Sequence, residues 1–536
     1  MSKSTDTPGD RFDVVVVGAG FAGLHLLHRL RGMGLSVRVF EAASGVGGTW
    51  FWNRYPGARC DIESMEYSYQ FSAELQQEWE WTERYATQPE ILRYIEHVTE
   101  RFELLRDVQL ETRVLRAAFD DTRQRWEVET DRGPVSATHC VMATGCLSSA
   151  HMPDFPGIDQ FAGDIFHTGR WPHEGVDFTG KRVGVIGTGS SAVQSIPIIA
   201  EQAEQLTVFQ RTATYAVPAH NHPLDPGHQE AIKARYPEFR AANRQTYLGF
   251  GSDYPAADEA ATEASPEERE ARYQERWGHG GLAFMGAYRD LLVSSEANES
   301  ASKFVRGKIR SIVEDATVAE LLSPYQVLGC KRLCVDTGYY DTFNRPNVSL
   351  VDVSETPIEG LTERGLQVGG SEYEFDAIVF ATGFDAMTGA LQRIDIRGRD
   401  GLALAEKWAR GPRTYLGLGT AGFPNLFIVT GPGSPSVLTN MLPSIEQHVE
   451  WIADCIDHLR ANDLHCVEAT KTAEDEWVAH VNQVADLTLF PSCNSWYLGA
   501  NVPGKPRVFM PYLGFASYVA KCEEVAARGY EGFALS

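Results

Sequence analysis

Long hydrophobic runs are missing from this sequence of 536 residues. No stretch approaches the roughly 20 apolar residues that a membrane-spanning helix needs. Residues 1–11 are polar and lack the apolar segment of a secretory signal. We therefore expect a cytoplasmic protein that has no membrane partner.

Positive charge is also scarce. Lys and Arg total 48 against 72 Asp and Glu, which gives a formal net charge of −24. A surface of this kind repels the phosphates of nucleic acids and the anionic headgroups of membranes. We expect no nucleic-acid partner, and we expect a monomer, with a homodimer as the alternative.

Paired cysteine motifs are absent as well. The nine cysteines are an odd number, and none of them form the CxxC pairs that bind zinc. We expect no metal site and reduced thiols in a reducing compartment. Cys330 and Cys334, which lie close together in the chain, are interpreted as packing thiols.

Two glycine-rich turns are present, and each follows a short apolar run that is typical of a buried parallel strand. The runs are residues 14–17 and 183–186. In such turns the first Gly allows a tight turn, the second lets a pyrophosphate approach the backbone, and the third position needs a small residue. The phosphates then bind at the N-terminus of the helix that follows. The turn residues are Gly18, Gly20, Phe21, Ala22 and Gly23 in the first, and Gly187, Thr188, Gly189, Ser190 and Ser191 in the second.

The strand after each turn ends in a residue of opposite charge. Residues 36–40 lead to Glu41, a carboxylate suited to ribose hydroxyls, whereas residues 206–210 lead to Arg211 and Thr212. An arginine at this position suits a 2′-phosphate. A lone glycine-rich turn is weak support, but two turns with matching partners predict two cofactors, FAD and then NADPH.

The order of segments predicts an α/β fold with two dinucleotide-binding, Rossmann-like domains. With 43% hydrophobic residues the chain can form two or three cores. Residues 108–114 and 126–130 are expected strands, residues 444–460 an amphipathic helix, and residues 143–145 and 381–383 repeat the tripeptide Ala-Thr-Gly. We expect an FAD domain formed by residues 1–147 and 388–536, an NADP domain formed by 148–219 and 331–387, and a helical insertion at 220–330.

Residues 161–172 read FAGDIFHTGRWP. This segment resembles the FxGxxxHxxxWP fingerprint of type I Baeyer–Villiger monooxygenases, and it lies just before the second glycine-rich turn, as in that family. Its fingerprint residues are Phe161, Gly163, His167, Trp171 and Pro172. Flavin monooxygenases that oxidise nitrogen or sulfur usually carry Tyr or Phe in place of Trp171.

Further segments resemble the same family, so that the resemblance extends from about residue 13 to 533. Residues 47–57 look like its flavin-side loop, 329–332 like its active-site arginine segment, and 495–497 like part of a flap. Residues 436–441 look more like the phenylacetone and steroid monooxygenases than the cyclohexanone type. Two departures are small, namely Phe51 for a frequent Tyr and Ala192 at the third glycine position.

The resemblance implies an enzyme that holds FAD and uses NADPH and oxygen to convert ketones, cyclic or aryl/alkyl, to esters or lactones through a C4a-peroxyflavin. Sulfoxidation is a compatible side activity. By resemblance, Arg332 is the catalytic cation of the family. An arginine suits this role because it stays charged when partly buried and can stabilise the negative charge that develops on the reacting oxygen. Asp61 would orient it. The alternative for this pair is a structural ion pair.

The resemblance also implies the remaining contacts of the two cofactors. FAD would contact Gly48, Thr49, Trp50, Asp61, Tyr67, Val114 and Met441 in addition to the first turn and Glu41. NADP would contact Arg59, Gln194, Lys331, Arg332 and Trp496 in addition to the second turn, Arg211 and Thr212. A solvated lysine is the alternative for Lys331, and an ordinary core aromatic is the alternative for Trp496, which we place in a flap over NADP. For His167 we favour a structural role between domains over that of a general base.

Three other functions compete with this interpretation. A flavin monooxygenase acting on amines or thioethers is disfavoured by Trp171 and the Lys331–Arg332 pair. A disulfide reductase would need a redox-active cysteine pair next to the first helix, and none is present there. A non-catalytic NADPH sensor would be expected to lose the flavin or the arginine.

Overall fold

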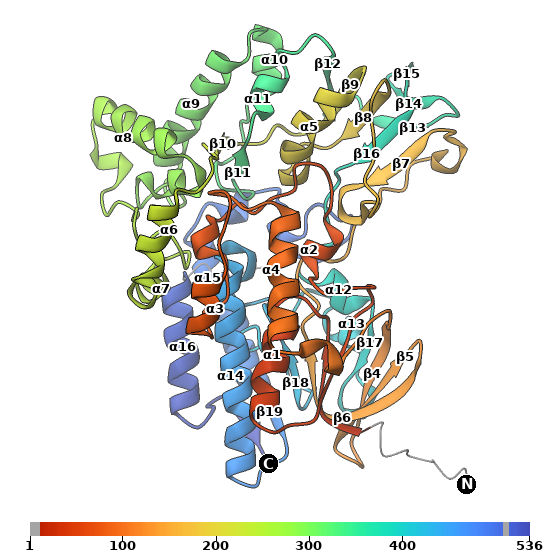
Figure 1. Cartoon of the computed structure of the whole chain (residues 1–536), viewed down its shortest axis with the longest axis vertical. Coiled ribbons are helices and arrows are strands. Elements are labelled where there is room, and N and C mark those ends of the chain that lie inside the picture. The colour runs from red at the N-terminus through yellow and green to blue at the C-terminus, as the bar shows by residue number, and fades with distance from the viewer. Residues whose placement is uncertain (1–10, 508–513) are drawn as a thin grey trace.

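The first of two large sheets is built around β1, and it lies in the lower half of the view in Figure 1. The computed structural model describes residues 11–507 and 514–536. The sheet has the order β17-β4-β5-β6-β1-β2-β3, and β18 pairs with β6. Its strands are β1 (Arg11–Val17), β2 (Val37–Phe40), β3 (Val108–Gln109), β4 (Val114–Asp120), β5 (Arg125–Thr130), β6 (Gly133–Met142), β17 (Asp395–Arg397) and β18 (Leu426–Ile428).

The central strand β1 is buried because its end is apolar. Val14, Val15 and Val16 are completely shielded from solvent, as expected for a parallel strand with both faces covered. β1 pairs in parallel with β2 on one side and with β6 on the other. The three strands therefore run in the same direction, and their carboxyl ends lie at one edge of the sheet.

The second large sheet contains only parallel strands. Its order is β12-β9-β8-β16-β7, and it lies above the first sheet in the view of Figure 1. Its strands are β7 (Asp164–His167), β8 (Arg182–Ile186), β9 (Gln205–Gln210), β12 (Val348–Asp352) and β16 (Ala377–Phe380). The expectation of two dinucleotide-binding units is confirmed. A small antiparallel sheet of β13 (Ile358–Leu361), β14 (Gly365–Val368) and β15 (Ser371–Glu374) lies between β12 and β16 in the chain.

A helical insertion leaves the second unit after β9 and returns to it before β12. Its two ends are held together because β10 (Ala216–Pro218) pairs in parallel with β11 (Cys334–Asp336). This pairing brings the residues just before β11 back to the end of the second unit's β9. The inserted helices are α6 (Pro226–Lys233), α7 (Tyr236–Gln245), α8 (Pro266–His279), α9 (Ser295–Ile312) and α10 (Ala316–Leu321).

The last third of the chain returns to the first unit. β17 pairs with β4 and β18 pairs with β6, and the long helix α14 (Met441–Ala461) packs on α1 (Phe21–Gly32). Arg29 of α1 forms ion pairs with Glu450 and Asp454 of α14. The other elements of this part are α12 (Gly389–Gln392), α13 (Leu404–Lys407), α15 (Lys471–Asp486), α16 (Phe515–Ala527), β19 (Val467–Ala469) and β20 (Phe533–Leu535).

Five further helices complete the fold. They are α2 (Thr49–Trp52), α3 (Ala73–Glu78), α4 (Gln88–Arg101) and α11 (Tyr339–Thr342), and helix α5 (Ser190–Gln202) follows the second glycine-rich turn. One large apolar core joins the inner faces of both sheets and the helices between them. Within the described ranges, no helix is both long and apolar enough to cross a membrane.

Two expectations from the sequence are wrong. Residues 108–114 do not form one strand, because β3 ends at Gln109 and β4 begins at Val114 in a different part of the sheet. The thiols are not all reduced either, since Cys330 and Cys493 form a disulfide. The fold brings these residues, 163 positions apart, to a Cα–Cα distance of 5.7 Å. The other seven cysteines, including Cys334, are free and buried.

Candidate cofactor-binding and active site

A cavity of about 1350 Å³ lies between the two sheets, at the carboxyl ends of their strands. Ligands of open parallel α/β sheets bind in this location. Both glycine-rich turns face the cavity. Of the residues predicted from the sequence, its lining includes Gly18, Gly20, Phe21, Ala22, Glu41, Gly48, Thr49, Trp50, Arg59, Asp61, Tyr67, Val114, Gly187, Thr188, Gly189, Ser190, Ser191, Gln194, Arg211, Thr212, Lys331, Arg332, Met441 and Trp496.

The first turn is tightly enclosed by backbone. Gly18 has a φ of +106°, and a Cβ atom there would lie 2.5 Å from the carbonyl oxygen of Ala143. Gly23 is outside the lining, but a Cβ atom on it would lie 1.9 Å from the carbonyl oxygen of Gly18. Both positions therefore require glycine so that the turn, helix α1 and the end of β6 can pack together.

A neighbouring loop covers this turn. A Cβ atom on Gly48 would lie 3.0 Å from the Cα atom of Gly20, so the two backbones are almost in contact. In the same loop, the indole N–H of Trp50 donates to the Tyr67 hydroxyl at 3.1 Å. Glu41 is buried, and its carboxylate accepts hydrogen bonds from the backbone N–H groups of Ala19 and Ala43, each at 2.8 Å. The acidic end of β2 is thus held in position beside the turn.

The second turn repeats the first in one respect and differs in another. Gly187 has a φ of +113°, and its Cβ atom would lie 2.5 Å from the carbonyl oxygen of Ala381. A Cβ atom on Gly189, in contrast, would meet no atom within 4 Å. The Thr188 hydroxyl donates to the carbonyl oxygen of Thr212 at 2.7 Å and joins the turn to the end of β9. The second turn is therefore fixed at its base and open above.

Two cations lie at this end of the cavity. Arg211 is exposed and Lys331 is half-buried. Burial and the nearby charge of Arg211 both lower the pKa of Lys331 below its ordinary value. In the ranges 11–507 and 514–536, the ion pairs found involve neither residue. Two like charges that line the same cavity, one lowering the pKa of the other, suit an anionic ligand group.

Arg332 is held by three hydrogen bonds. Its Nε and Nη2 atoms donate to the two carboxylate oxygens of Asp61, the latter at 3.0 Å, and Nη1 donates to the carbonyl oxygen of Val437 at 2.9 Å. The side chains are only 19% and 24% exposed. Burial works against the positive charge, but the Asp61 carboxylate outweighs it and raises the pKa of Arg332. The guanidinium is therefore permanently charged at the cavity wall.

The loop after α2 joins the two units. The Tyr55 hydroxyl donates to the side-chain oxygen of Gln194 at 2.8 Å, and the Gln194 amide donates to the carbonyl oxygen of Arg59 at 3.1 Å. A Cβ atom on Gly57 would lie 2.3 Å from the carbonyl oxygen of Gln194. Arg59 lines the cavity, while its guanidinium forms an ion pair with Glu83 at 3.2 Å. This loop thereby fixes the distance between the first unit and helix α5.

The fingerprint residues Phe161, Gly163, His167, Trp171 and Pro172 are absent from the lining of the cavity. His167 is buried, and burial lowers its pKa to about 4. Its Nδ1 accepts from the backbone N–H of Gly169 at 2.9 Å, so Nε2 carries the proton. Nε2 lies 3.3 Å from both the carbonyl oxygen of His151 and the Thr382 hydroxyl. A neutral histidine in these contacts connects β7 to the segments that run between the two units.

The segment 487–507, called the flap below, forms part of the cavity wall. Trp496 is half-buried and lines the cavity, whereas its neighbour Tyr497 is buried. The flap consists of short 3-10 turns at Phe490–Ser492 and Trp496–Leu498. Its far end is fixed by Asn501, whose amide donates to the carbonyl oxygen of Phe384 at 2.8 Å, and by Lys505, which pairs with Asp385.

Sequence reasoning missed several contributors. Tyr55, the carbonyl group of Val437 and the disulfide cysteine Cys330 all belong to the cavity wall or its supports. The repeated Ala-Thr-Gly segments were a usable signal, because Ala143 and Ala381 are the residues against which the first glycine of each turn packs. Among the described residues, no cluster of His, Cys, Asp and Glu side chains could hold a metal ion.

Comparison with known proteins identifies relatives along the whole chain. Residues 15–246 match a family model described as pyridine nucleotide-disulphide oxidoreductase. A Baeyer–Villiger monooxygenase of Pseudooceanicola batsensis is 44% identical over 99% of this chain and 97% of its own. An acetone monooxygenase (methyl acetate-forming) of Gordonia sp. is 42% identical over 98% and 99%. The solved structure of oxidised steroid monooxygenase bound to NADP is 56% identical, with a TM-score of 0.93 and coverage of 98% of this chain and 99% of that one.

Proposed function

Because this chain belongs to the Baeyer–Villiger monooxygenase family, we propose that its two glycine-rich turns divide the cavity between two cofactors and that Arg332 and Asp61 form the reaction centre between them. The protein is an FAD-containing monooxygenase that uses NADPH and oxygen. Two rivals set out from the sequence, a disulfide reductase and a non-catalytic sensor, are thereby displaced as the main function. The residue assignments below are our proposal.

The first turn is proposed to hold the FAD. Support comes from the glycines of this turn, because Gly18 and Gly20 line the cavity and Gly18 has the positive φ that a tight phosphate-binding turn requires. The N-terminus of α1 adds its unpaired N–H groups and partial positive charge. Glu41 faces the same cavity from the end of β2, at the place where a carboxylate binds ribose hydroxyls. Trp50, Tyr67, Val114 and Met441 contribute the apolar part of the wall, and Thr49 lies beside Trp50.

The second turn is proposed to hold NADPH. Gly189 leaves open space at the start of α5, and the Arg211–Lys331 pair lies beyond it with two positive charges. A 2′-phosphate satisfies both cations, whereas the bare ribose of NADH does not. The single observation that carries the proposed choice of cofactor is this pair of cations facing the same cavity as the turn.

Arg332 is proposed to stabilise negative charge on the reacting oxygen atoms. When bound, FAD supplies the activation of molecular oxygen and NADPH supplies the reducing hydride. The guanidinium lines the cavity, stays charged, and is oriented by Asp61 and by the Val437 carbonyl group. A fixed cation in a site that excludes water stabilises a developing oxyanion without reorganisation. Asp61 therefore acts as a positioning residue.

The proposed substrates are apolar ketones, which the enzyme would convert to esters or lactones. The wall around Arg332 is formed by apolar side chains such as Cys146, Leu147, Val437 and Met441. These side chains offer packing to a hydrocarbon frame, while the guanidinium supplies the polar contact for the carbonyl oxygen. Thioethers share the apolar frame, so sulfoxidation is a compatible side activity.

The proposed division of the chain places residues 1–147 and 388–536 in the FAD domain, 148–219 and 331–387 in the NADP domain, and 220–330 in the insertion. Support comes from strand pairing. β17 and β18, although late in the chain, join the first sheet, while β16 pairs with β8 of the second glycine-rich unit and β7 pairs with β16.

The test of the proposed centre is Arg332→Ala, assayed with NADPH, oxygen and a panel of ketones and thioethers. Removing one well-placed oxyanion donor costs about 10²–10³ in rate, and we expect ester formation to fall at least that far while FAD remains bound. Asp61→Asn should give a smaller loss, because the arginine is still present but less well oriented. Arg29→Ala, which removes a guanidinium from a surface ion pair, is the matched control. Ester formation by Arg332→Ala at a rate near that of the unchanged protein would remove Arg332 from the reaction centre.

A further inference from the structure

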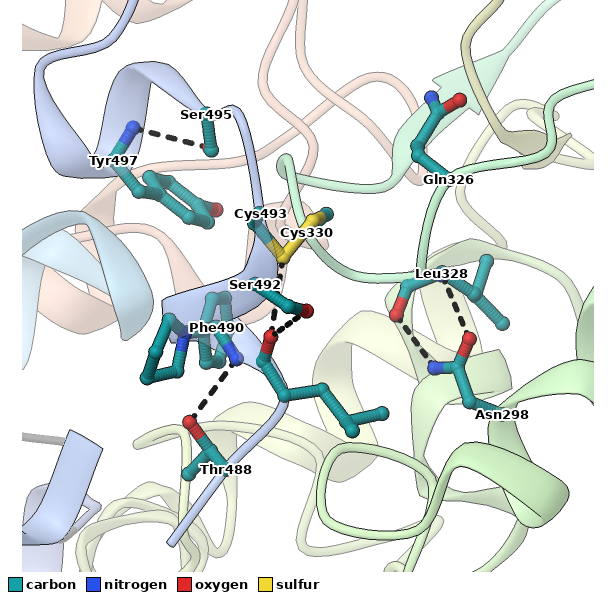
Figure 2. Close-up of a disulfide and its surroundings, with 12 residues drawn as sticks. Asn298, Gln326, Leu328, Cys330, Thr488, Phe490, Ser492, Cys493, Ser495 and Tyr497 are labelled. Atoms are coloured by element: carbon teal, nitrogen blue, oxygen red, sulfur yellow. Dashed lines mark hydrogen bonds between the residues drawn. A yellow bond between two sulfur atoms is a disulfide. The ribbon is translucent and has the colours of Figure 1, made fainter. Parts of the chain in front are cut away.

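The disulfide between Cys330 and Cys493 joins the arginine segment to the flap (Figure 2). Cys330 is two residues before Arg332, and Cys493 is three residues before Trp496. We propose that Cys330 and Cys493 are positioning residues for the oxygenation reaction and that their disulfide holds the flap closed over the cavity. This inference rests on the proposed oxygenation function and on the place of Arg332 in it.

One end of the disulfide is attached to a rigid support. Leu328 and Asn298 exchange two hydrogen bonds: the Asn298 amide donates to the Leu328 carbonyl oxygen at 2.9 Å, and the Leu328 N–H donates to the Asn298 side-chain oxygen at 2.9 Å. Both bonds are visible in Figure 2. Asn298 is buried in α9, and Gln326 donates to the carbonyl oxygen of Ala213 at 2.7 Å. Cys330, which is 3% exposed, is therefore fixed to both the insertion and the second unit.

The other end lies in backbone whose hydrogen bonds are mostly local within residues 11–507 and 514–536. The N–H group of Cys493 donates to the Phe490 carbonyl oxygen at 2.9 Å, and that of Tyr497 donates to the Ser495 hydroxyl at 3.2 Å. Phe490 and Tyr497 add apolar contacts with Val437 and Cys146. Short turns with few long-range hydrogen bonds open at low free-energy cost. The disulfide is the covalent link between this segment and the arginine segment.

The disulfide lies in the part of the flap that also carries Trp496, between the two anchors of the flap. Leu489 donates to the Leu292 carbonyl oxygen at 2.9 Å, and Asn501 and Lys505 hold the far end at residues 384–386. Trp496 lies between these two anchors and begins the 3-10 turn that follows the one capped by Cys493. A covalent link keeps the flap at a high effective concentration relative to its closed position. Without it, the described part of the flap is held closed by non-covalent contacts, which include the two anchors and the packing of Phe490 and Tyr497.

Closure matters because the oxygenation step needs a site from which water is excluded. An open flap admits water next to Arg332 and lets reducing equivalents pass to oxygen without ester formation. The expected defect on breaking the disulfide is therefore a loss of coupling, with more hydrogen peroxide formed and less ester per NADPH consumed. If breakage lowers the closed population from nearly all molecules to about half, the ratio of ester to NADPH falls about twofold.

The experiment compares the full-length protein before and after reduction with dithiothreitol, with removal of excess reagent before assay. One thiolate of the dithiol attacks a sulfur of the disulfide, and its second thiolate closes a cyclic disulfide, leaving two protein thiols. Alkylation and intact mass count the thiols, with seven expected before reduction and nine after it. Ester, NADPH and hydrogen peroxide are then measured together. We expect the coupling ratio to fall about twofold or more and to recover after reoxidation with oxidised glutathione.

Variants separate a positioning role from general damage. Cys493→Ser should show the reduced-protein ratio and no response to dithiothreitol, and adding Cys330→Ser should cause no further loss, because one link is removed only once. Cys466→Ser, which alters a buried free cysteine elsewhere, should keep both the unchanged ratio and the response to reduction. Trp496→Ala should be uncoupled in either redox state.

Three results would overturn the proposal. They are nine free thiols in the protein as purified, an unchanged coupling ratio after verified reduction, and a dithiothreitol response that persists in Cys493→Ser. If Trp496→Ala keeps full coupling while reduction lowers it, the proposed role of Trp496 fails and that of the disulfide stands. A protein that makes no ester in any state contradicts the proposed function and is recognised before reduction.

Discussion

The two glycine-rich units pack their first glycine in the same way, but they differ in the segments that lie near their second glycine. In both, the first glycine has a positive φ and packs within 2.5 Å, measured from a Cβ position, of an alanine carbonyl oxygen. Gly20 of the first unit faces the Gly48 backbone, whereas Gly189 of the second faces open space. At the third position, the first unit needs Gly23, while the second accepts Ala192.

This difference suits two modes of cofactor binding. A turn covered by a second loop encloses its ligand and slows release, as expected for a flavin that stays bound through many turnovers. An open turn flanked by two cations allows a charged cofactor to enter and leave. The shared base shows that each strand–turn–helix unit was specified locally, while the covering segments came from other parts of the chain.

The largest expected effect comes from exchanging the third residue of each turn. In Gly23→Ala, the new Cβ atom would lie 1.9 Å from the Gly18 carbonyl oxygen. Overpacking of this kind typically costs about 1–3 kcal/mol, and more when backbone blocks the atom. We expect FAD to be lost or the protein to become insoluble, whereas Ala192→Gly should cost only about 1 kcal/mol of helix stability. The FAD content per chain is the measurement, and a Gly23→Ala protein with full FAD would refute the packing argument.

The second expected effect concerns the cations of the open unit. Arg211→Ala should weaken NADPH by about 10–100-fold, because a charged hydrogen bond contributes about 1.5–3 kcal/mol. NADH should be almost unaffected. Lys331→Ala should also weaken NADPH more than NADH, but by a smaller factor. The reason is that burial and Arg211 lower the pKa of Lys331, so its charged form is less favoured. The measurement is kcat/KM for both cofactors, and equal losses for NADPH and NADH would show that Arg211 does not bind the 2′-phosphate.

A smaller effect is expected from Gly189→Ala. The added methyl group meets no protein atom within 4 Å, so the fold and bound FAD should be unchanged. It would occupy space that a pyrophosphate needs, and the loss of about one hydrogen bond corresponds to about tenfold weaker NADPH binding. Titration of NADPH against the FAD-loaded variant measures this. Unchanged affinity would mean that the pyrophosphate does not approach this glycine.

The smallest effect is a dependence of stability on pH. Burial lowers the pKa of His139, on β6, and of His167, on β7, to about 4 each. Between the unfolded value of about 6.5 and 4, the unfolded chain binds protons that the native chain does not, so the free energy of unfolding decreases as pH falls. Each histidine should contribute about 1–3 kcal/mol over this window.

The check is urea unfolding of wild type, His139→Gln and His167→Gln at several pH values between about 6.5 and 4.5, which lie within the window set by the unfolded and native pKa values. Each variant should have a shallower loss of stability on acidification than wild type. If the slopes are equal, these histidines are not buried in neutral form, and the contacts described for His167 do not hold in solution.

The sequence by itself determined the two units and their cofactors, because the information is local. A strand, a glycine-rich turn and a charged residue at the next strand's end lie within about 30 residues and are fixed by backbone geometry. Residues 161–172 were also readable as a unit, since their family pattern is contiguous.

Only the tertiary structure decided which residues that are distant in the sequence become neighbours. Residues 108–114 had the composition of one strand, yet the sheet assigns their ends to different neighbours. The pairing of Cys330 with Cys493 depends on a separation of 163 positions that no spacing rule can connect. The bond from Arg332 to the Val437 carbonyl group involves backbone, which every residue possesses and which therefore leaves no mark in the sequence.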